Sequence, residues 1–471
     1  MSAVFGAFPP LGTAAGEIIR AALVGAGFLV IFAAAEGWKR RFGPPVEWTR
    51  KFVHFAGGLL VAAFPWLFAS RWTVLALAAA FAGIIGLSRS FRLLGSVHGV
   101  ERRSEGALYY PIAICVLFMV SRSHPVLYLI SILTLVLSDA LAAVLGSAYG
   151  RWTYPVETDR KSVEGSVVFF LTTFLVVHLP LLLLTEIDRG VSVLIGVQAA
   201  LLVTACEAIS LRGSDNLIIP LATYYLLVKM TPKSAEWLVG LLLAQIGIIG
   251  VIGLLAWRTR FLTLSGAMAA QLVLYGALSL GGPRWALAML LALAGVMTLD
   301  LTVSRRTGAP NGGYQVLAVF YTSLVAVLLL LISNTLSTLL PMPWVFRRGN
   351  PFYGPFVGAL AGQLAILVYQ ELDRLPPWKR LSDAGRAFAA VGIGFTVVVP
   401  ISLWGGTGRL PGAELAVAGA IAFGAVAVYN AGRRLARRSK TGVQSLRLQA
   451  ASVALVTGLV TSLYLRWLGV I

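Results

Sequence analysis

The sequence is poor in charged residues and in cysteine. Only 12% of its 471 residues are Asp, Glu, Lys or Arg, about half the share found in a soluble globular protein, so a soluble fold is excluded. The two cysteines, Cys115 and Cys206, provide neither a disulfide framework nor a CxxC metal motif. The chain also lacks a GxxxxGK[ST] loop, the HRD and DFG motifs of protein kinases, an HExxH motif and a GxSxG elbow. Any phosphate chemistry must therefore depend on other charged side chains.

Apolar residues, in contrast, make up 58% of the chain, and its mean hydropathy is +0.84. A helix needs about 20 apolar residues to cross the core of a bilayer. No alternating pattern of outer-membrane strands is present, so we predict an all-α, polytopic helical bundle with about 16 transmembrane helices. The predicted spans are 17–37, 52–70, 72–88, 106–121, 125–147, 164–185, 190–209, 215–231, 236–257, 262–281, 284–303, 315–335, 353–371, 386–405, 412–431 and 448–468.

The 38 basic residues outnumber the 19 acidic residues, which gives a formal charge of +19. In a soluble protein this excess would suggest binding to nucleic acid. Here the basic residues cluster in alternate short loops between apolar runs, such as "WKRRFGPPVEWTRK" and "GRWTYPVETDRKS". This is the positive-inside pattern of membrane proteins, so we expect these loops to lie in the cytoplasm and expect no nucleic-acid partner.

Polar residues inside or beside the apolar runs are concentrated before residues 257–262. After this point, charged residues occur mostly in loops. We therefore predict a functional membrane domain over residues 1–260, with about nine helices. A second membrane domain, with about seven helices and no assigned function, is predicted over residues 261–471.

Asp139 lies well inside the predicted span 125–147. A carboxylate within a membrane is costly and by default indicates a functional site. Ser138, Ala142, Gly146 and Gly150 follow one another at intervals of four and form a stripe of small residues beside it. The alternative is that this stripe only packs against another helix, but packing does not require a buried acid.

The loop that follows contains "ETDRKSVEGS". Lys161 and Glu164 are three residues apart, so we expect them on one side of the helix that begins here. The alternative is that Ser162 caps this helix and that Glu164 only favours its first turn. Gly165 and Ser166 are small enough to let a ligand or another backbone come close. A carboxylate and a lysine together suit a divalent cation and a phosphate.

A second group lies in "CEAISLRGSDNLIIPL", where Glu207 ends one span and Asp215 and Asn216 begin the next. Asp215 could be an ordinary helix cap. If the loop is a tight reversal, however, Glu207 and Asp215 face the same cytoplasmic pocket as Asp139.

Two further groups lie at the predicted cytoplasmic ends of spans. In "TRKFVHFAGG", Arg50, Lys51 and His54 could form an anion site, or the histidine could simply be hydrogen-bonded. In "ERRSEGALYYPIA", Arg102 and Tyr110 are candidates, and the alternative is a basic loop followed by an aromatic belt.

Five ordered motifs, "RKFVHFAGG", "GALYYPIA", "SDALAAVLGSAYGR", "DRKSVEGS" and "EAISLRGSDNLIIPL", resemble the phytol kinase and dolichol kinase family of polyprenol kinases. The resemblance covers about residues 48–225, and the phytol kinase branch is the more similar. It implies a membrane kinase that transfers a phosphate from a nucleoside triphosphate, typically CTP, with Mg²⁺ or a similar divalent cation. The implied acceptor is the hydroxyl group of a long isoprenoid alcohol in the bilayer, and the implied partners are this alcohol, the nucleotide and membrane lipids.

The resemblance also implies roles for individual residues. The implied catalytic residues are Asp139, Lys161 and Glu164. The implied metal ligands are Asp139, Glu164, Glu207 and Asp215. The resemblance implies that Lys161 binds the triphosphate and that Lys51 and His54 flank its phosphates. Together with the sequence patterns above, the candidate nucleotide- or phosphate-binding residues are Arg50, Lys51, His54, Gly146, Gly150, Arg151, Lys161, Ser162, Gly165 and Ser166. Asn216, Arg102 and Tyr110 are further candidates.

Three other functions are alternatives. The first is an activity like that of phosphatidate cytidylyltransferase, whose related motif the chain shares only in part. The second is phosphorylation of diacylglycerol, and the third, from a different class, is transport of a lipid or small molecule.

The second half resembles, more weakly, the membrane family that contains phytyl-phosphate kinase. The resemblance lies in "RFLTLSGAMAAQLVLYGALSLGG" and "SRRTGAPNGGYQVLA". The acidic motif of that family is missing from the corresponding segment, "YGPFVGALAGQLAILVYQELDR". No functional residues are therefore carried over to this half.

Overall fold

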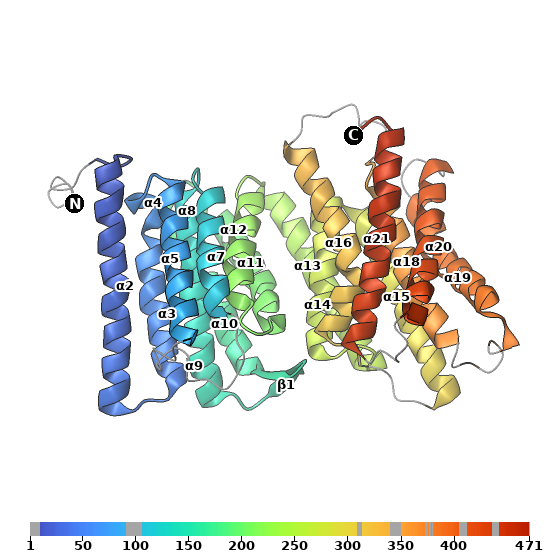
Figure 1. The fold of residues 1–471 in the computed structure, drawn as a ribbon, viewed down its shortest axis with the longest axis horizontal. Helices are drawn as coiled ribbons and strands as arrows, with labels where there is room; N and C mark the ends of the chain where they lie inside the picture. Colours follow the sequence, from blue (N-terminus) through green and yellow to red (C-terminus); the bar gives the residue numbers. More distant parts are fainter. Residues whose placement is uncertain are drawn as a thin grey trace. The chain divides into compact units, whose positions relative to one another are not determined.

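The computed structural model is almost entirely helical (Figure 1). It describes residues 10–90, 106–308, 313–339, 350–372, 375, 378, 380–404, 412–435 and 442–470. Helices are expected because a chain inside a bilayer must satisfy its backbone N–H and C=O groups internally. The α-helices are α2 (Ala14–Phe42), α3 (Val46–Ala62), α4 (Phe64–Leu67), α5 (Arg71–Ser90), α7 (Gly106–Val120), α8 (Pro125–Leu133), α9 (Asp139–Tyr149), α10 (Val163–Leu184), α11 (Arg189–Ile209), α12 (Asp215–Met230), α13 (Ala235–Thr259), α14 (Leu264–Gly276), α15 (Pro283–Thr307), α16 (Val316–Leu339), α18 (Tyr353–Leu372), α19 (Asp383–Trp404), α20 (Gly412–Leu435) and α21 (Val443–Trp467). Two π-helical turns, η1 (Thr134–Ser138) and η2 (Ala277–Gly281), and two strands, β1 (Thr153–Val156) and β2 (Asp159–Ser162), complete the described elements.

The prediction of an all-α, multi-pass membrane protein is confirmed. Within the described residues, 12 helical segments are long and apolar enough to cross a membrane. The other four of the sixteen predicted spans coincide with α3, α5, α7 and α12. The apolar parts of α5 and α7 are shorter, Arg71–Ile84 and Gly106–Val120. The predicted span 52–70 is interrupted at Ala63, where α3 ends and α4 begins.

Packing contacts divide the chain into two compact units, Met1–Leu243 and Ala244–Ile471. We call these unit 1 and unit 2. The division falls inside α13, close to the boundary that the sequence predicts at residue 260. All the candidate site residues belong to unit 1.

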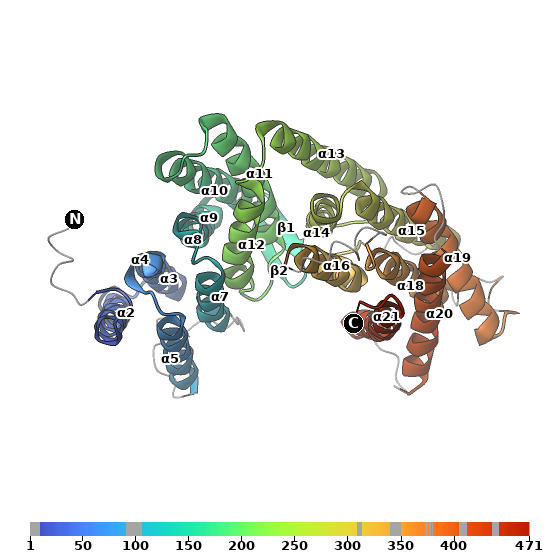
Figure 2. The ribbon, with the colours of Figure 1, turned by 90° about the horizontal axis from the view of Figure 1, so that it is seen from above.

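The core of unit 1 is built around one long helical segment, Pro125–Tyr149, which consists of α8, η1 and α9. This segment packs against α3, α10 and α12 (Figure 2). Among the side chains that it buries most completely are Tyr128, Ile130, Ile132 and Leu135. The segment is therefore held firmly at the point where it presents Asp139.

Helix α10 shows how the unit meets lipid. Its exposed apolar side chains recur every fourth residue and so form one stripe along the helix. The stripe consists of Val167, Leu171, Leu175, Leu179 and Leu183. An apolar stripe of this kind is suited to contact with hydrocarbon chains.

The strands β1 and β2 form an antiparallel hairpin between α9 and α10. Thr153 pairs with Ser162, and Tyr154 pairs with Lys161. Glu157, at the turn, has a φ of 52°, a left-handed conformation that a tight reversal requires. The sequence predicts only a loop at this place.

Unit 2 is organised around α18, nearly all of whose residues are buried. Its glycines at intervals of four let α20 approach closely, since a Cβ atom at Gly358 would lie 2.8 Å from the Cα atom of Ala418. Buried amides also join α18 to α21. Gln363 donates to Gln449 at 2.8 Å, and Gln449 donates to Gln370 at 3.0 Å.

Candidate active site

The first part of the site comes from α3, where Lys51 and His54 are three residues apart and lie on one face of the helix. Both residues reach the carboxylate of Asp139. The Lys51 ammonium is 2.5 Å from Asp139 Oδ2, and His54 Nε2 is 3.9 Å from the same oxygen. Lys51, Asp139 and His54 are therefore brought together.

Close packing of α3 on η1 brings Lys51 and His54 within reach of Asp139. A Cβ atom at Gly58 would lie 2.0 Å from Cγ2 of Val136, so only glycine fits there without movement. The π-helical turn η1 ends at Ser138, immediately before Asp139. Turns of this type insert an extra residue into a helix and are frequent at functional sites. Ser138 is fixed from the other side because its hydroxyl accepts a hydrogen bond from Thr173 at 2.9 Å.

The carboxylate of Asp139 is well removed from solvent. The residue is only 8% exposed, and the side chains of Lys51 and Asp139 are 14% and 12% exposed. A buried carboxylate is stable only when it is paired, and the Lys51 ammonium provides the pair.

The second part of the site is an ion pair between β2 and the end of α11. Lys161 Nζ donates to Glu207 Oε1 at 2.7 Å, to Ser210 Oγ at 3.1 Å and to the backbone carbonyl of Glu207. The sequence predicts Lys161 on the same helix as Glu164, and this prediction is wrong. Lys161 is part of β2, and α10 begins two residues later at Val163. The hairpin turns Lys161 toward α11 instead.

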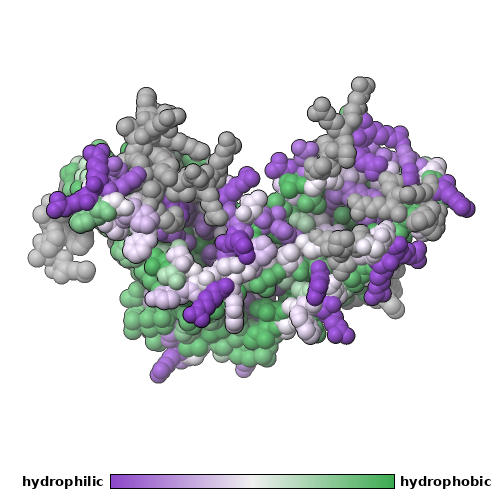
Figure 3. Space-filling view, turned by 90° about the horizontal axis from the view of Figure 1, so that it is seen from below, coloured by the Kyte–Doolittle hydropathy of each residue, from purple (hydrophilic) through white to green (hydrophobic). Residues whose placement is uncertain are grey.

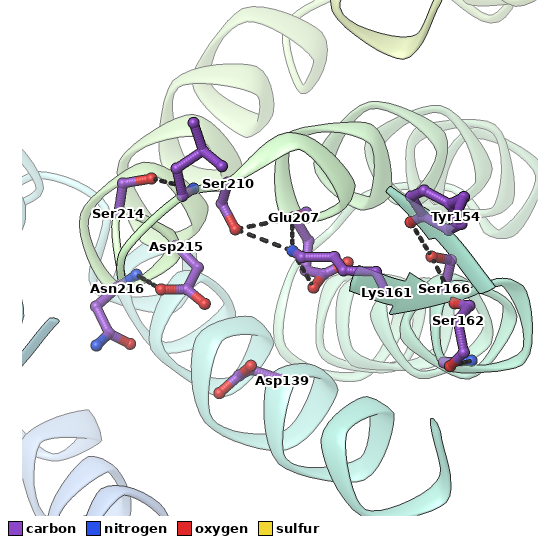
Figure 4. A network of polar contacts seen from close by, with 12 residues as sticks. Asp139, Tyr154, Lys161, Ser162, Ser166, Glu207, Ser210, Ser214, Asp215 and Asn216 are labelled. Atoms are coloured by element: carbon purple, nitrogen blue, oxygen red, sulfur yellow. Dashed lines mark hydrogen bonds and ion pairs between the residues drawn. The ribbon is translucent and has the colours of Figure 1, made fainter. Parts of the chain in front are cut away.

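The third part is the N-terminus of α12. Arg212 and Gly213 have φ values of 52° and 85°, and the chain reverses tightly after α11. This reversal places Asp215 within electrostatic range of both Asp139 and Lys161. Figure 4 shows the carboxylates of Asp139 and Asp215 and the Lys161–Glu207 pair around one common space.

Asn216 holds α12 against α7. Its side-chain amide donates to the backbone carbonyl of Gly106 at 3.0 Å. Tyr110, one turn further along α7, contacts His54, and the centroids of their rings are 5.3 Å apart. Arg102, another candidate, lies outside the described residues.

Glu164 has a different environment from the other acids. Its Oε1 atom accepts hydrogen bonds from the backbone N–H groups of Arg151 at 2.8 Å and Trp152 at 3.1 Å. The carboxylate thus supports the chain at the start of the hairpin. Arg151 takes part through its backbone, and its side chain is exposed.

Ser162 caps α10, since its hydroxyl accepts a hydrogen bond from the N–H of Gly165 at 3.2 Å. The small residues beside it form a close contact between α9 and α10. A Cβ atom at Gly146 would lie 3.0 Å from the Cα atom of Gly165, and one at Gly150 would lie 2.7 Å from the Cβ atom of Ser162. These residues therefore pack against one another, and a role in phosphate binding stays a prediction.

Tyr154 and Ser210 are two residues at the site that the sequence did not single out. The Tyr154 hydroxyl shares a hydrogen bond of 2.9 Å with Ser166, and burial raises the pKa of Tyr154 to about 12, so the phenol stays protonated. Ser210 could have been found from its position three residues after Glu207. The Ser210 hydroxyl donates a hydrogen bond to the backbone carbonyl of Glu207 at 2.8 Å. Tyr154 gives no such signal, because only the hairpin brings it to Ser166.

The four predicted metal ligands are not assembled as one set. Within the described ranges, no three side chains of His, Cys, Asp or Glu are placed to hold an ion together. Asp139 and Asp215 nevertheless offer hard anionic oxygens beside a common space. This suits Mg²⁺, which is usually held by one or two carboxylates together with water and substrate phosphates.

The end of the molecule that carries the hairpin is seen in Figure 3. In this view, hydrophobic side chains cover much of one side of unit 1. The fold and the site together define a multi-pass membrane protein with a buried cluster of acids and lysines near the ends of its helices.

A known protein shares this part of the chain. A phytol kinase of Synechocystis sp. is 36% identical over 185 residues, which correspond to 38% of this chain and 77% of that protein. The chain therefore belongs to the phytol kinase family. No protein-family model matches the sequence, and no solved structure matches it.

Proposed function

We propose that unit 1 phosphorylates the hydroxyl group of an isoprenoid alcohol, with phytol as the preferred acceptor and CTP as the phosphate donor. Membership in the phytol kinase family supports the reaction and the acceptor. CTP follows from the motifs that resemble polyprenol kinases. The observation that carries the proposal is the convergence of two lysine–carboxylate pairs and Asp215 in one place.

The reaction needs positioning and charge stabilisation more than covalent chemistry. The oxygen of the alcohol forms a bond to the γ-phosphorus, and the bond from this phosphorus to the β,γ-bridging oxygen breaks. The electron pair of that bond leaves with the nucleoside diphosphate, and the proton of the hydroxyl passes to a carboxylate of the site. Lys51 and Lys161 offset the negative charge of the phosphates.

Asp139 and Asp215 would hold Mg²⁺, with Glu207 close by. When bound, the ion neutralises charge on the β- and γ-phosphates. Asp139 remains paired with Lys51, so the two residues would act on the same phosphate region. Glu164 supports the hairpin that carries Lys161, and we assign it this positioning role.

The position of the charges favours an enzyme over a transporter. Transporters place their polar site near the middle of the bilayer. Here Lys161 lies in a hairpin outside the helices, Glu207 is in the last turn of α11, and Asp215 is the first residue of α12. Such a site can take a nucleotide from water and an alcohol from lipid. The basic loops orient it toward the cytoplasm.

The test uses the purified full-length chain in lipid–detergent micelles with Mg²⁺. CTP or ATP labelled in the γ-phosphate is supplied with phytol, dolichol or diacylglycerol, and CTP labelled in the α-phosphate is supplied with phosphatidate. We expect label from γ-labelled CTP to appear in phytyl phosphate. The control variant is Asp383→Asn, which changes a carboxylate of unit 2 that pairs with Arg434 at 2.7 Å.

Failure of the folded chain to label any alcohol would contradict the proposal. Labelling of phosphatidate by α-labelled CTP would instead identify a cytidylyltransferase. Faster labelling of diacylglycerol than of phytol would contradict the proposed acceptor.

A further inference from the structure

Two buried polar atoms, one on His54 beside Asp139 and one on Tyr110 beside His54, have no hydrogen-bond partner among the described residues. They are Nε2 of His54 and the hydroxyl oxygen of Tyr110. Tyr110 is only 8% exposed. A buried polar group without a partner costs about 1–3 kcal/mol, so such atoms call for an explanation.

The two atoms have complementary hydrogen-bonding capacity. His54 also makes a hydrogen bond to the backbone of Leu135. In a neutral ring whose Nδ1–H donates to the backbone carbonyl of Leu135, Nε2 carries no proton and is a hydrogen-bond acceptor. The phenol of Tyr110 can donate. A hydroxyl group, which has one proton and two lone pairs, can satisfy both atoms at once.

The location of the two rings suits a hydroxyl group that arrives from lipid. The ring contact joins α3 and α7, which otherwise pack on different neighbours, α3 on α2 and α8, and α7 on α5 and α12. The neighbouring side chains Phe55 and Leu59 on α3, and Leu108 and Ile112 on α7, are exposed and apolar. An apolar chain can therefore lie along these helices while its polar end reaches the rings.

We propose that His54 and Tyr110 bind the hydroxyl group of the lipid alcohol and hold it beside Asp139. This inference rests on the proposed kinase function. The hydroxyl donates a hydrogen bond to His54 Nε2 and accepts one from Tyr110, and Asp139 Oδ2 lies 3.9 Å from the same imidazole nitrogen. His54 is thereby assigned to the acceptor alcohol, whereas the family resemblance implies that it flanks the phosphates of the nucleotide.

The test compares Tyr110→Phe with a matched control, Tyr128→Phe. Tyr128 is also buried, but its hydroxyl donates to the carbonyl of Val61 at 3.1 Å. For each full-length variant, the KM for phytol, the KM for CTP and the midpoint of thermal unfolding without substrate are measured. The affinity for phytol is also compared with the affinity for its hydrocarbon analogue, which lacks the hydroxyl group and is measured as a competitor of phytol.

We expect opposite patterns from the two variants. Tyr110→Phe should raise the KM for phytol about 3- to 10-fold, which corresponds to one lost hydrogen bond, and should leave the KM for CTP unchanged. It should also reduce the preference for phytol over the hydrocarbon and should not lower the unfolding midpoint. Tyr128→Phe should lower the midpoint and leave both KM values unchanged.

An unchanged KM for phytol in Tyr110→Phe, or an equal rise in both KM values, would overturn the assignment and leave the kinase function intact. A lower unfolding midpoint in Tyr110→Phe would show that the hydroxyl has a structural partner and would also overturn it. If the wild-type chain phosphorylates no alcohol, both proposals fail.

Discussion

Replacement of Asp139 by Asn would leave Lys51 beside a neutral partner in a place where both side chains are largely shielded from solvent. Removal of one partner from a buried ion pair destabilises a protein by about 3–5 kcal/mol, mainly because the other charge is left uncompensated. The Lys51 and Asp139 side chains keep 14% and 12% of their exposure. We therefore expect the lower end of this range, about 3 kcal/mol, for Asp139→Asn and for Lys51→Met.

The double variant separates stability from activity. With both charges removed, neither member of the pair leaves an uncompensated charge, and the free energy of unfolding should return to within about 1 kcal/mol of the wild type. Phosphorylation of phytol should stay at least about 100-fold below the wild type in both single variants and in the double variant, because the carboxylate and the lysine are needed by the reaction itself.

Unfolding is measured with SDS in mixed micelles, and activity is measured as transfer of label from CTP to phytol. Asp383→Asn serves as the control, since Asp383 is 45% exposed and its ion pairs should contribute less than about 1 kcal/mol. A double variant no more stable than the single variants would refute the ion-pair argument. Full activity in Asp139→Asn would refute the assignment of Asp139 to the active site.

Two further predictions concern the elements that position the site. Gly58→Ala should destabilise unit 1 by about 1–3 kcal/mol, because the added Cβ atom would lie 2.0 Å from Val136. The control is Gly83→Ala, which should not destabilise the unit because nothing lies within 4 Å of its added Cβ atom. Equal unfolding midpoints for the two variants would contradict the packing argument. Glu164→Ala should make the β1–β2 hairpin more susceptible to trypsin and should lower activity without changing the Mg²⁺ concentration needed for half-maximal rate. A large rise in that concentration would show that Glu164 binds the metal.

Hydropathy was sufficient to predict the helices, because each run long enough to cross a bilayer must satisfy its own backbone. It could not predict that span 52–70 is interrupted at Ala63. Nor could it predict the hairpin, whose strands have four residues each and depend on pairing with one another. As a result, the sequence placed Lys161 on a helix beside Glu164, whereas β2 directs it to Glu207.

The candidate site was predicted as a set of residues but not as a set of pairs. Loop charge alone put the candidate groups at one membrane face. The ion pair between Lys51 and Asp139 joins positions 88 residues apart, and no local pattern indicates it. Close approach at Gly58 is what allows it, and this depends on the three-dimensional packing of α3 and η1.

The enclosure of α18 has a consequence for how the protein is made. This helix is the least apolar of the candidate spans, and nearly all of it is covered by protein. When it leaves the ribosome, α19, α20 and α21, which later pack against it, have not yet been synthesised. Its glutamines must then face lipid or remain near the translocon until those helices arrive. Insertion of α18 is therefore coupled to synthesis of the helices that follow it, and chains that stop before them would expose a segment for quality-control proteases.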